Sequence, residues 1–467
     1  MTEQAEPTQP TQPAQQVDVV VIGMGPGGEE MAGALADAGL DVVGIEDNLV
    51  GGECPYWGCV PSKMMIRAAN ALAEARRIPG LAGQVSVQPD WAPVARRIRE
   101  EATDSWHDDV AVERFEGKGG RLVRGRGRLA GPGRVIAGDE EFVARRGVVL
   151  ATGSQAAIPP IPGLNNIPYW TNRELVEAER LPRSLVVLGG GAIGLELAQV
   201  AARFGTEVTV VEALDRLVAQ EEPEVSQLLA NVFAHEGIRV RTGVSAASVA
   251  LSAGGAINVI LADGSSVAGE RLLVATGRRA VLADLGLETV GLDPGARAVP
   301  VDEQLRAAPG LWAVGDVTGE GMFTHVAVYQ GRIATASILG RNVKAADYHA
   351  LPRVTFTDPE IGSVGLTEAG ARAEGIDVRA GLGAVPSSAR GWIHKVGNEG
   401  VIKLVADRAR GVLVGATSAG PAGGEVLSLL TLAVQVAVPI AELRSMIYAY
   451  PTFHRGIEDA LRDLGDS

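Results

Sequence analysis

The chain contains two runs of β-branched and other apolar residues that are typical of buried parallel strands. They are residues 17–22 (VDVVVI) and the start of 184–191 (SLVVLGGG). After each run the apolar positions take a helical spacing, and a second short strand comes next. The helices are expected at 29–39 and 195–205, and the second strands at 41–46 and 207–212. The pattern predicts an α/β fold in which one β-α-β unit occurs twice.

The C-terminal portion of the chain has a different pattern. Its alternation of residues predicts a strand–turn–strand over 351–368 and a hairpin over 400–420. A long apolar stretch over 424–446 predicts helices. The apolar surface that these helices would present favours a homodimer.

Glycines stand at fixed positions between the first strand and the helix of each unit. The spacing is G-x-G-x-x-G, which is typical of dinucleotide-binding loops. The first glycine permits the tight turn, the second lets the backbone approach a pyrophosphate, and the third lets helix and strand pack closely. The helix N-terminus then offers N–H groups to the phosphates. The two sets are Gly23, Gly25 and Gly28, and Gly189, Gly191 and Gly194.

An acidic residue ends the second strand of each unit. Glu46 and Glu212 both lie 23 positions after the first glycine of their unit, where a carboxylate accepts hydrogen bonds from ribose hydroxyls. A carboxylate also repels a 2′-phosphate, and the next arginine after Glu212 is Arg216. We therefore expect NAD(H) at the second unit in preference to NADP(H), which stays possible. A nicotinamide needs an electron partner, so the first unit is expected to bind FAD.

Length and charge narrow the class of protein. A chain of 467 residues is long enough for about three domains. The formal net charge of −14 argues against nucleic acid and membranes as partners, because both prefer a basic protein face. Residues 1–16 are polar and rich in Pro and Gln, so we expect a disordered tail rather than a signal peptide. With only two cysteines and no targeting segment, the protein is expected in the cytoplasm.

Both cysteines lie in residues 51–63 (GGECPYWGCVPSK), five positions apart. A structural disulfide is rare in the cytoplasm. No metal is predicted, because the chain has no second cysteine pair and its six histidines are scattered. An inert buried pair is the plainer alternative. A pair that is repeatedly oxidised and reduced fits best, because flavin and nicotinamide also carry two electrons each.

The stretch 51–63 resembles the redox-active signature of class I pyridine nucleotide–disulfide oxidoreductases. This family includes dihydrolipoamide dehydrogenase, glutathione reductase and mercuric reductase. The likeness continues in order along nearly the whole chain. The further motifs are VVVIGMGPGG (19–28), VVLATGS (148–154), LLVATGR (272–278), LWAVGDV (311–317) and VTFTDPEIGSVGLTE (354–368).

The resemblance implies roles for individual residues. Cys59 is the sulfur nearer the flavin and forms the charge-transfer thiolate, whereas Cys54 is the interchange sulfur that attacks the acceptor. Lys63 lies near the flavin and pairs with Glu196. Contacts with FAD are implied for Gly52, Thr152, Gly153, Ser154, Gly315, Asp316 and the stretch from Met322 to His325. Contacts with NAD are implied for Val244 and Gly277.

The resemblance also implies the architecture, which has two Rossmann-like dinucleotide-binding domains and an α+β dimerisation domain. An FAD-binding domain (17–165 and 281–345) is interrupted by an NAD(P)-binding domain (166–280). An interface domain (346–467) would then form the homodimer.

The C-terminal stretch departs from the family pattern. Relatives that reduce disulfides have an acid–base His there with a Glu five residues later, but this chain has Tyr450 and Arg455. Tyrosine has an ordinary pKa of about 10, so it is a poor base at neutral pH. If this segment is helical, His454 and Glu458 share one face and provide a substitute pair. The alternative is that His454 is an ordinary surface histidine.

A second departure lies between the cysteines, where Tyr56 and Trp57 replace smaller residues. They either narrow the site or stack on a flat acceptor, or they only pack against the helix. The chain also lacks the C-terminal cysteine pair and N-terminal metal-binding domain of many mercuric reductases, which disfavours mercury as the acceptor.

The leading hypothesis is an FAD-dependent NAD(P)H oxidoreductase. Its Cys54–Cys59 disulfide would pass electrons to a small disulfide or another electrophilic small molecule. A lipoamide dehydrogenase is a weaker version, because Tyr450 and Arg455 replace its base. One alternative is direct reduction of a quinone by the flavin, with secondary cysteines. Another is a flavoprotein redox sensor with low turnover.

Overall fold

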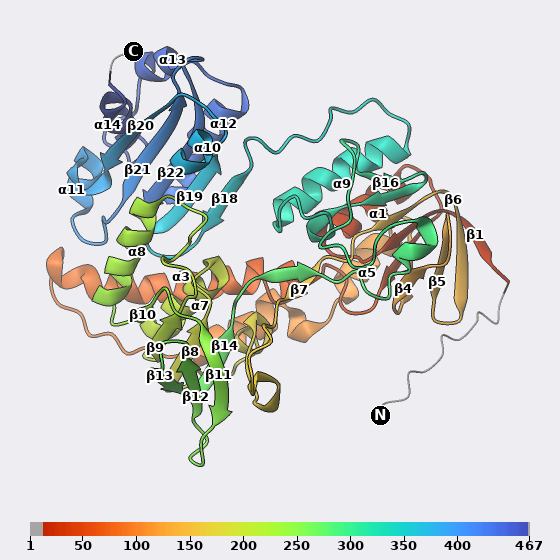
Figure 1. The fold of residues 1–467 in the computed structure, drawn as a ribbon, viewed down its shortest axis with the longest axis horizontal. Helices are drawn as coiled ribbons and strands as arrows, with labels where there is room; N and C mark the ends of the chain where they lie inside the picture. Colours follow the sequence, from red (N-terminus) through yellow and green to blue (C-terminus); the bar gives the residue numbers. More distant parts are fainter. Residues whose placement is uncertain (1–12, 466–467) are drawn as a thin grey trace. The chain divides into compact units, whose positions relative to one another are not determined.

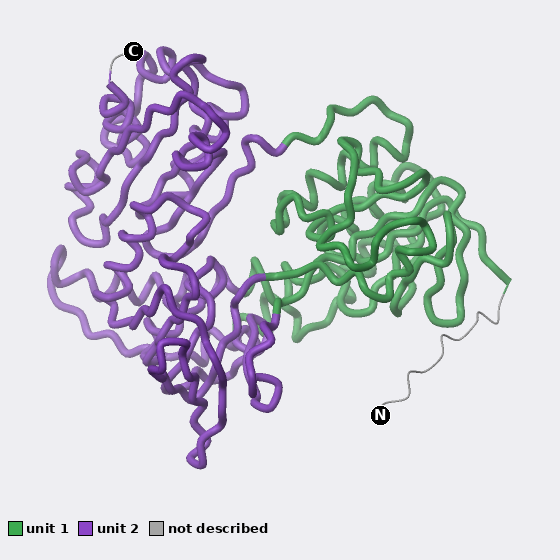
Figure 2. Tube along the Cα trace, in the orientation of Figure 1, with its two compact units in different colours: residues 1–61, 97–157, 278–347 green, residues 62–96, 158–277, 348–467 purple. Residues whose placement is uncertain are grey.

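The computed structural model describes residues 13–465. The chain forms two compact units, each assembled from three separate stretches (Figure 2). Within the described residues, unit 1 comprises 13–61, 97–157 and 278–347, and unit 2 comprises 62–96, 158–277 and 348–465. Figure 1 labels the helices and strands of both units.

Unit 1 is built on a largely parallel sheet with the strand order β16-β17-β6-β1-β2-β3. The strands along this order are β1 (Gln15–Ile22), β2 (Val42–Glu46), β3 (Arg121–Arg124), β6 (Glu140–Leu150), β16 (Arg306–Ala308) and β17 (Leu311–Ala313). Two further strands, β4 (Gly127–Leu129) and β5 (Arg134–Ala137), complete the eight-stranded sheet through the antiparallel pairing of β5 with β6. β1 pairs in parallel with β2 on one side and with β6 on the other. Val19, Val20 and Val21 are therefore fully enclosed, with 0% exposure, as their unbroken apolar run predicts.

The first strand begins earlier than predicted. Gln15 and Gln16 belong to β1 and lie opposite Phe142 and Val143 of β6, so the predicted tail extends too far at its C-terminal end. The strand pairing satisfies the backbone groups of these polar residues, which composition alone does not reveal. The rest of the predicted tail, through residue 12, lies outside the described residues.

The helices of unit 1 include α1 (Pro26–Asp37), α2 (Glu53–Tyr56), α5 (Asp109–Glu116) and α9 (Thr324–Ile338), and α3 (Cys59–Arg77) begins there. α1 packs closely on α9, because a Cβ on Gly27 would already lie 3.0 Å from the carbonyl oxygen of Ala327. α1 starts three residues before the predicted range, since Pro26 is favourable in a first helical turn. It ends before Gly39, whose φ of +82° is incompatible with a continuing helix.

Unit 2 contains a second parallel sheet with the order β10-β9-β8-β14. Its elements are β8 (Ser184–Leu188), α7 (Ala192–Arg203), β9 (Glu207–Val211), α8 (Pro223–His235), β10 (Arg239–Arg241) and β14 (Arg271–Val274). α7 begins three residues before its predicted start, as α1 does. Unit 2 also contains a three-stranded antiparallel sheet, formed by β11 (Ala246–Leu251), β12 (Ile257–Leu261) and β13 (Ser266–Gly269).

The C-terminal part of unit 2 is a five-stranded antiparallel sheet with the order β18-β19-β22-β21-β20. Its strands are β18 (Pro352–Thr355), β19 (Glu360–Gly365), β20 (Val378–Ala384), β21 (Val401–Asp407) and β22 (Val412–Gly420). α12 (Gly423–Gln435) and α14 (Gly456–Asp463) pack on this sheet, and α13 (Ile440–Ser445) lies between them in sequence. The predicted α/β fold class is confirmed.

Candidate active site

The first glycine loop, between β1 and α1, forms an open cradle at a helix N-terminus. Gly23 has a φ of +94°, and a Cβ there would lie 2.4 Å from the carbonyl oxygen of Ala151. A Cβ on Gly28 would lie 2.0 Å from the Gly23 oxygen, whereas a Cβ on Gly25 would meet nothing within 4 Å. The outer glycines permit close packing, and Gly25 leaves open space over the first N–H groups of α1. This cradle fits a pyrophosphate.

The second glycine loop, between β8 and α7, repeats this geometry in unit 2. Gly189 has a φ of +111°, and a Cβ there would lie 2.2 Å from the carbonyl oxygen of Ala275. A Cβ on Gly194 would lie 2.3 Å from the Gly189 oxygen, while Gly191 faces open space. A second cradle that fits a pyrophosphate therefore lies at the N-terminus of α7.

The carboxylate at the end of each second strand holds its own glycine loop. Glu46 is 9% exposed and accepts the N–H of Met24 at 2.7 Å and that of Asn48 at 2.9 Å. Burial raises the pKa of Glu46, and these amide hydrogen bonds oppose the rise. In unit 2, Glu212 accepts the equivalent N–H, that of Gly190. Both carboxylates are fixed beside a cradle, with lone pairs left for ribose hydroxyls.

The two cysteines lie beside the first cradle. Gly51 and Gly52 have φ values of +106° and +68°, and a Cβ on Gly52 would lie 2.9 Å from the Cα of Gly25. Cys54 follows in α2, and Cys59 is the first residue of α3. Both are thiols, Cys54 partly buried and Cys59 exposed.

The two thiols interact with each other and with one hydroxyl. The hydrogen bond with the Cys59 side chain, together with burial, raises the pKa of Cys54 well above its ordinary value. Thr324, the first residue of α9, places its Oγ1 3.3 Å from Sγ of Cys59 and also bonds to the Cys54 side chain. The two sulfurs are therefore close neighbours, as a cysteine pair that exchanges between dithiol and disulfide requires.

The aromatic residues between the cysteines are buried. Tyr56 is 6% exposed and Trp57 is 7% exposed. The Tyr56 hydroxyl donates to the carbonyl oxygen of Val50 at 3.1 Å, and the two ring centres are 5.9 Å apart. This arrangement fits packing against the protein interior rather than a platform for a flat acceptor.

A chain of polar contacts runs through unit 1 to the residue before Cys54. Ser154 Oγ donates to Asp316 Oδ2 at 2.5 Å, and Arg278 Nε donates to Ser154 Oγ at 2.8 Å. Arg278 Nη1 also lies 3.7 Å from Glu53 Oε2. Sequence reasoning assigned no role to Arg278 or Glu53, although both stand inside the motifs LLVATGR and GGECPYWGC.

The surroundings of Thr152 fit a flavin. Its Oγ1 is buried and has no hydrogen-bond partner among residues 13–465. The adjacent Gly153 has a φ of +66°, and a Cβ there would meet nothing within 4 Å. The other implied flavin contacts, Gly315, Met322 and His325, lie in or near η6 (Gly315–Thr318) and the start of α9. An unsatisfied hydroxyl beside open backbone matches the polar groups of a flavin.

Lys63 and Glu196 form an ion pair in unit 2, with 2.8 Å between Nζ and Oε2. The other carboxylate oxygen of Glu196 accepts the N–H of Phe356 at 2.8 Å, and Lys63 Nζ lies 4.5 Å from the centre of the Phe356 ring. The Glu196 side chain is 7% exposed and that of Lys63 is 36% exposed. The pair ties α3 to α7.

The two implied NAD contacts lie after strands of the second parallel sheet. Val244 follows β10, and its N–H donates to the carbonyl oxygen of Glu212 at 3.2 Å. Gly277 follows β14 with a φ of +117°. Both lie beyond the carboxyl ends of parallel strands, where dinucleotides bind in such sheets.

The C-terminal stretch differs from the expectation. α14 begins at Gly456, so His454 lies outside the helix and the predicted shared face of His454 and Glu458 is wrong. Glu458 instead pairs with Arg455, at 2.7 Å between Oε2 and Nε. Tyr450 is 68% exposed, and the Arg455 guanidinium lies over its ring, 5.0 Å from the ring centre. Catalytic roles for Tyr450, His454 and Glu458 stay predictions.

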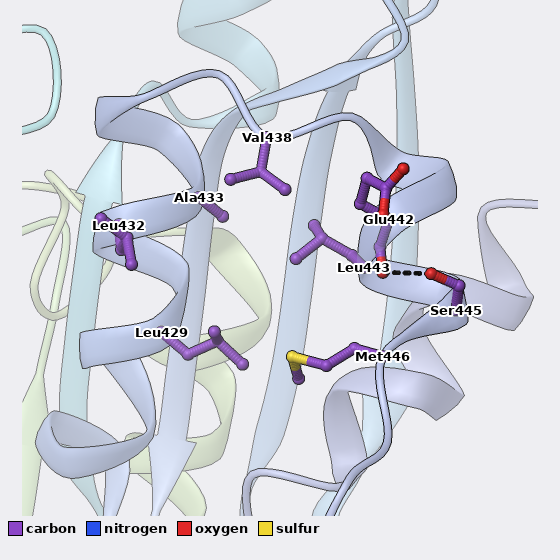
Figure 3. Close-up of a pocket in the computed structure, with 8 residues that line it drawn as sticks. All are labelled: Leu429, Leu432, Ala433, Val438, Glu442, Leu443, Ser445 and Met446. Atoms are coloured by element: carbon purple, nitrogen blue, oxygen red, sulfur yellow. Dashed lines mark hydrogen bonds between the residues drawn. The ribbon is translucent and has the colours of Figure 1, made fainter.

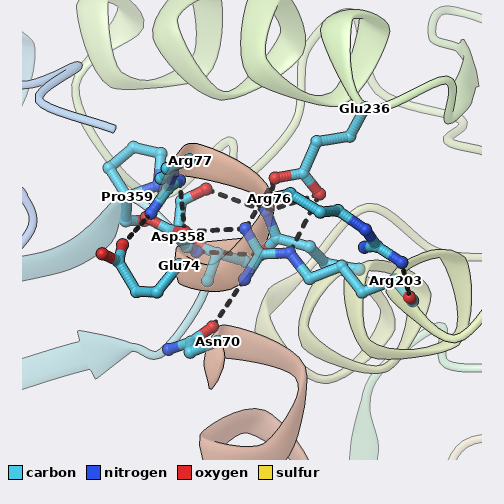
Figure 4. Close-up of polar contacts among 10 residues, drawn as sticks. Asn70, Glu74, Arg76, Arg77, Arg203, Glu236, Asp358 and Pro359 are labelled. Carbon is cyan, nitrogen blue, oxygen red and sulfur yellow. Dashed lines mark hydrogen bonds and ion pairs between the residues drawn. The ribbon is translucent and has the colours of Figure 1, made fainter. Parts of the chain in front are cut away.

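A buried polar cluster, which sequence reasoning missed, lies at the C-terminal end of α7 (Figure 4). Arg203, with a side chain 3% exposed, places Nη2 2.6 Å from Glu236 and 2.7 Å from Asp358. Its Nη1 donates to Asn70 at 2.5 Å, and Arg77 also pairs with Asp358 at 2.7 Å. Burial lowers the pKa of Arg203, but the carboxylates raise it overall. The cluster joins α3, α7, the end of α8 and the turn before β19.

Residues 13–465 lack two other kinds of feature, a membrane-spanning helix and a cluster of metal-binding side chains. No helix in this range has the length and apolar character to cross a bilayer. No group of three or more His, Cys, Asp or Glu side chains in the described part is arranged to hold a metal ion.

Comparisons with known proteins agree along most of the chain. Residues 17–331 match the pyridine nucleotide-disulphide oxidoreductase family, and residues 351–461 match the dimerisation domain of that family. A mercuric reductase of Streptomyces lividans is 35% identical over 454 residues, covering 94% of either chain. A dihydrolipoyl dehydrogenase of Thermus scotoductus is 33% identical, covering 96% of this chain and 97% of its own. The crystal structure of LpdA from Mycobacterium tuberculosis has a TM-score of 0.85 at 28% identity, covering 97% of this chain and 100% of its own.

Proposed function

This chain belongs to the pyridine nucleotide-disulphide oxidoreductase family, which binds FAD and uses NAD(P)H, and we propose its reaction on that basis. NADH is the electron donor, and the Cys54–Cys59 pair passes the electrons to a small disulfide or another electrophilic small molecule. The observation that carries this proposal is the close approach of Gly52 to Gly25, which sets the cysteine pair beside the first cradle.

Residues of both cradles bind the cofactors. The glycine loops hold the two pyrophosphates, and Glu46 and Glu212 accept hydrogen bonds from the riboses. Thr152, Ser154 and Asp316 supply polar contacts to the flavin and its ribityl chain. Bound FAD supplies a two-electron carrier between the nicotinamide and the disulfide.

The reduced cysteine pair acts on the acceptor in two exchange steps. Cys54 attacks one sulfur of a disulfide acceptor, forms a mixed disulfide and releases the first thiol. Cys59 then attacks the Cys54 sulfur, which closes the Cys54–Cys59 disulfide and releases the second thiol. One dithiol and one acceptor disulfide thus become one protein disulfide and two product thiols.

The acceptor class follows from the groups near the cysteines and at the C-terminus. Cys54 has a raised pKa, so a base must remove the proton of its thiol before the sulfur attacks the acceptor. Tyr450 stands where disulfide-reducing relatives have their acid–base His, and it is a poor base. Lipoamide, the substrate class of dihydrolipoyl dehydrogenases, is therefore a weaker candidate. Mercury is also weaker, because the chain has only two cysteines and no C-terminal pair.

We also propose that the protein is a homodimer and that its domains divide the chain as follows. The match of residues 351–461 to a dimerisation domain supports a homodimer. FAD belongs to residues 17–165 and 281–345, NAD(H) to 166–280, and the dimer interface to 346–467. The protein acts in the cytoplasm, with no nucleic acid or membrane as partner.

The experiment is an anaerobic titration of the purified protein with NADH, followed by counting accessible thiols. We expect bound FAD, and two new thiols per chain after reduction, because the chain has two cysteines. A Cys54→Ser variant should still oxidise NADH but lose turnover with disulfides. Full disulfide turnover in that variant contradicts the relay.

Two other outcomes would favour other functions. If NADH reduces the flavin but exposes no thiols, and the Cys54→Ser variant still reduces quinones, the flavin passes its electrons directly to the quinone. If no acceptor in a panel of disulfides and quinones supports steady NADH consumption, the protein is a redox sensor rather than a reductase.

A further inference from the structure

Gln330 is a fully buried amide on α9, with 0% exposure. Its Oε1 accepts the N–H of Gly315 at 2.6 Å, and its Nε2 donates to Oγ1 of Thr318 at 3.0 Å. Thr318 in turn donates from Oγ1 to the carbonyl oxygen of Gly315 at 2.9 Å. The three hydrogen bonds close a ring, so one side chain holds both ends of the four-residue turn η6.

The turn that Gln330 holds carries Asp316, the residue that accepts a hydrogen bond from Ser154 at 2.5 Å. Gly315 begins the turn with a φ of +80°, and Gly319 follows it with a φ of +77°. Glycine is the most permissive residue of the backbone, so a turn flanked in this way has little stiffness of its own. Its position depends on the contacts that Gln330 makes from outside.

The helix that carries Gln330 is itself fixed against the helix of the first cradle. A Cβ on Gly27 of α1 would lie 3.0 Å from the carbonyl oxygen of Ala327. A Cβ on Gly331, the residue after Gln330, would lie 3.1 Å from Cγ of Met31 and 3.2 Å from the carbonyl oxygen of Gly27. Glycines on both helices thus let the two backbones approach closely. Gln330 therefore joins η6 to a helix whose place beside the first cradle is set by packing.

Gln199 on α7 shows what a purely structural glutamine looks like in this protein. It is 3% exposed. Its Oε1 accepts the N–H of Asp358 at 2.8 Å, and its Nε2 donates to the carbonyl oxygen of Asp358, also at 2.8 Å. Gln199 thus also holds a loop by both ends of its amide, but it does so in unit 2 and not beside the first cradle.

We propose that Gln330 is a positioning residue for FAD. It holds the turn of Asp316 at a fixed place relative to the first cradle, so the groups that bind the pyrophosphate and the ribityl chain belong to one rigid frame. Gln330 is enclosed by protein, so it acts through Asp316 rather than by contact with the cofactor. This inference deepens the proposed function and rests on the contact of Asp316 with FAD.

The test dilutes the holoenzyme and measures the dissociation constant of FAD from the fluorescence of released flavin. Gln330→Met keeps an unbranched side chain but leaves the N–H of Gly315 without its acceptor. We expect it to weaken FAD binding by about tenfold. Asp316→Ala should also weaken binding. The double variant should bind FAD no more weakly than Asp316→Ala alone, because Gln330 acts only through Asp316. Two effects that multiply in the double variant overturn the proposal.

Gln199→Met is the matched control. It should lower the stability in urea and leave the dissociation constant of FAD unchanged. If it weakens FAD binding as much as Gln330→Met does, the loss reflects general stability and the proposal is overturned. Thr318→Val breaks the same ring from its other side and serves if Gln330→Met does not fold. A folded ring variant that keeps the wild-type dissociation constant also overturns the proposal.

Failure of this inference is distinguishable from failure of the proposed function. If the wild type retains no FAD, the proposed function fails. If the wild type binds FAD and Asp316→Ala releases it no more readily, the contact of Asp316 fails and the role of Gln330 fails with it. If Asp316→Ala weakens binding and Gln330→Met does not, only the role of Gln330 fails.

Discussion

Glu196 binds Lys63 with one carboxylate oxygen, at 2.8 Å, and the main-chain N–H of Phe356 with the other, also at 2.8 Å. One nearly buried charge thus joins the cysteine helix α3 to the helix that begins at the second glycine loop. The Glu196 side chain is 7% exposed, so its charge depends on these two partners.

Replacing Lys63 by Met should destabilise the protein because it leaves the Glu196 carboxylate buried without a cation. Breaking a fully buried pair costs about 3–5 kcal/mol, but Lys63 is partly solvated, so we expect about 1–3 kcal/mol. Urea unfolding measures this loss. The double variant Lys63→Met/Glu196→Gln should recover part of the stability, and strictly additive effects would contradict the coupling.

The buried cluster around Arg203 predicts a larger loss of stability than the Lys63–Glu196 pair does. Arg203→Leu removes the cation between Glu236 and Asp358 and should cost about 3–5 kcal/mol in the free energy of unfolding. Arg203→Lys should recover only part of this, because an ammonium cannot make the forked contacts of a guanidinium. Arg183→Leu is the control, since Arg183 is 96% exposed and pairs with a carboxylate at the surface. Equal melting temperatures for Arg203→Leu and the control would contradict the prediction.

The buried Tyr56 side chain predicts that the free energy of unfolding depends on pH in the alkaline range. Burial, followed by the charges of Asp108 and Glu29, raises the pKa of Tyr56 to about 12. The unfolded chain ionises this phenol from about pH 10 while the folded protein keeps it neutral. Stability is therefore lost as the pH rises from about 10 to about 12, by up to about 1.4 kcal/mol per pH unit.

Tyr56→Phe should lose about 1 kcal/mol at neutral pH with the hydrogen bond to Val50, yet show a flatter alkaline loss of stability. Chemical unfolding at a series of pH values measures both. Tyr450→Phe is the control, because that side chain is 68% exposed in the folded protein. A Tyr56→Phe profile parallel to that of the wild type would refute the assignment.

An apolar groove between α12 and α13 predicts where a second copy of the chain docks (Figure 3). Its volume is about 350 Å³, and Leu429, Leu432, Ala433, Val438, Leu443 and Met446 line it with Glu442 and Ser445. Leu432 is 56% exposed in a segment that matches a dimerisation domain. Leu432→Glu should therefore shift the protein from dimer to monomer in sedimentation, because a second carboxylate beside Glu442 would be buried without a cation.

Leu251 provides the matched control for this test. It is 53% exposed but lies on β11, outside the dimerisation domain. Leu251→Glu should leave the dimer intact, and dissociation of both variants would mean that Leu432 has no specific role.

Short-range sequence patterns predicted one part of the site, and long-range contacts formed the rest. The glycines of both loops could be recognised because their G-x-G-x-x-G spacing follows from a local strand–turn–helix path. Thr324 could not be placed against Cys59, because a separation of 265 positions carries no periodic signal. The Arg203 cluster was missed for the same reason. The His454–Glu458 expectation depended on a helix boundary, which is the least certain feature of a sequence pattern.

Glu212 predicts the choice between NADH and NADPH. Its carboxylate is held by the N–H groups of Gly190 and Leu214, so it lies fixed beside the second cradle and repels a 2′-phosphate. Arg216, the next arginine, is engaged with the carbonyl oxygens of Ala219 and Glu221 at 2.6 and 2.8 Å. We expect NADH to be used with a higher kcat/KM than NADPH, and Glu212→Ala to reduce the preference by about tenfold, or about 1.4 kcal/mol.

The control for Glu212→Ala is Glu207→Ala, because Glu207 lies at the start of the same strand with its side chain 75% exposed. It should keep the wild-type preference. Steady-state rates with both coenzymes and one acceptor measure the ratio. The charge of the Glu212 carboxylate is the feature that distinguishes a ribose hydroxyl from a 2′-phosphate at this position. Equal use of NADH and NADPH by the wild type, or an unchanged ratio in Glu212→Ala, would therefore show that this carboxylate does not discriminate between the two coenzymes.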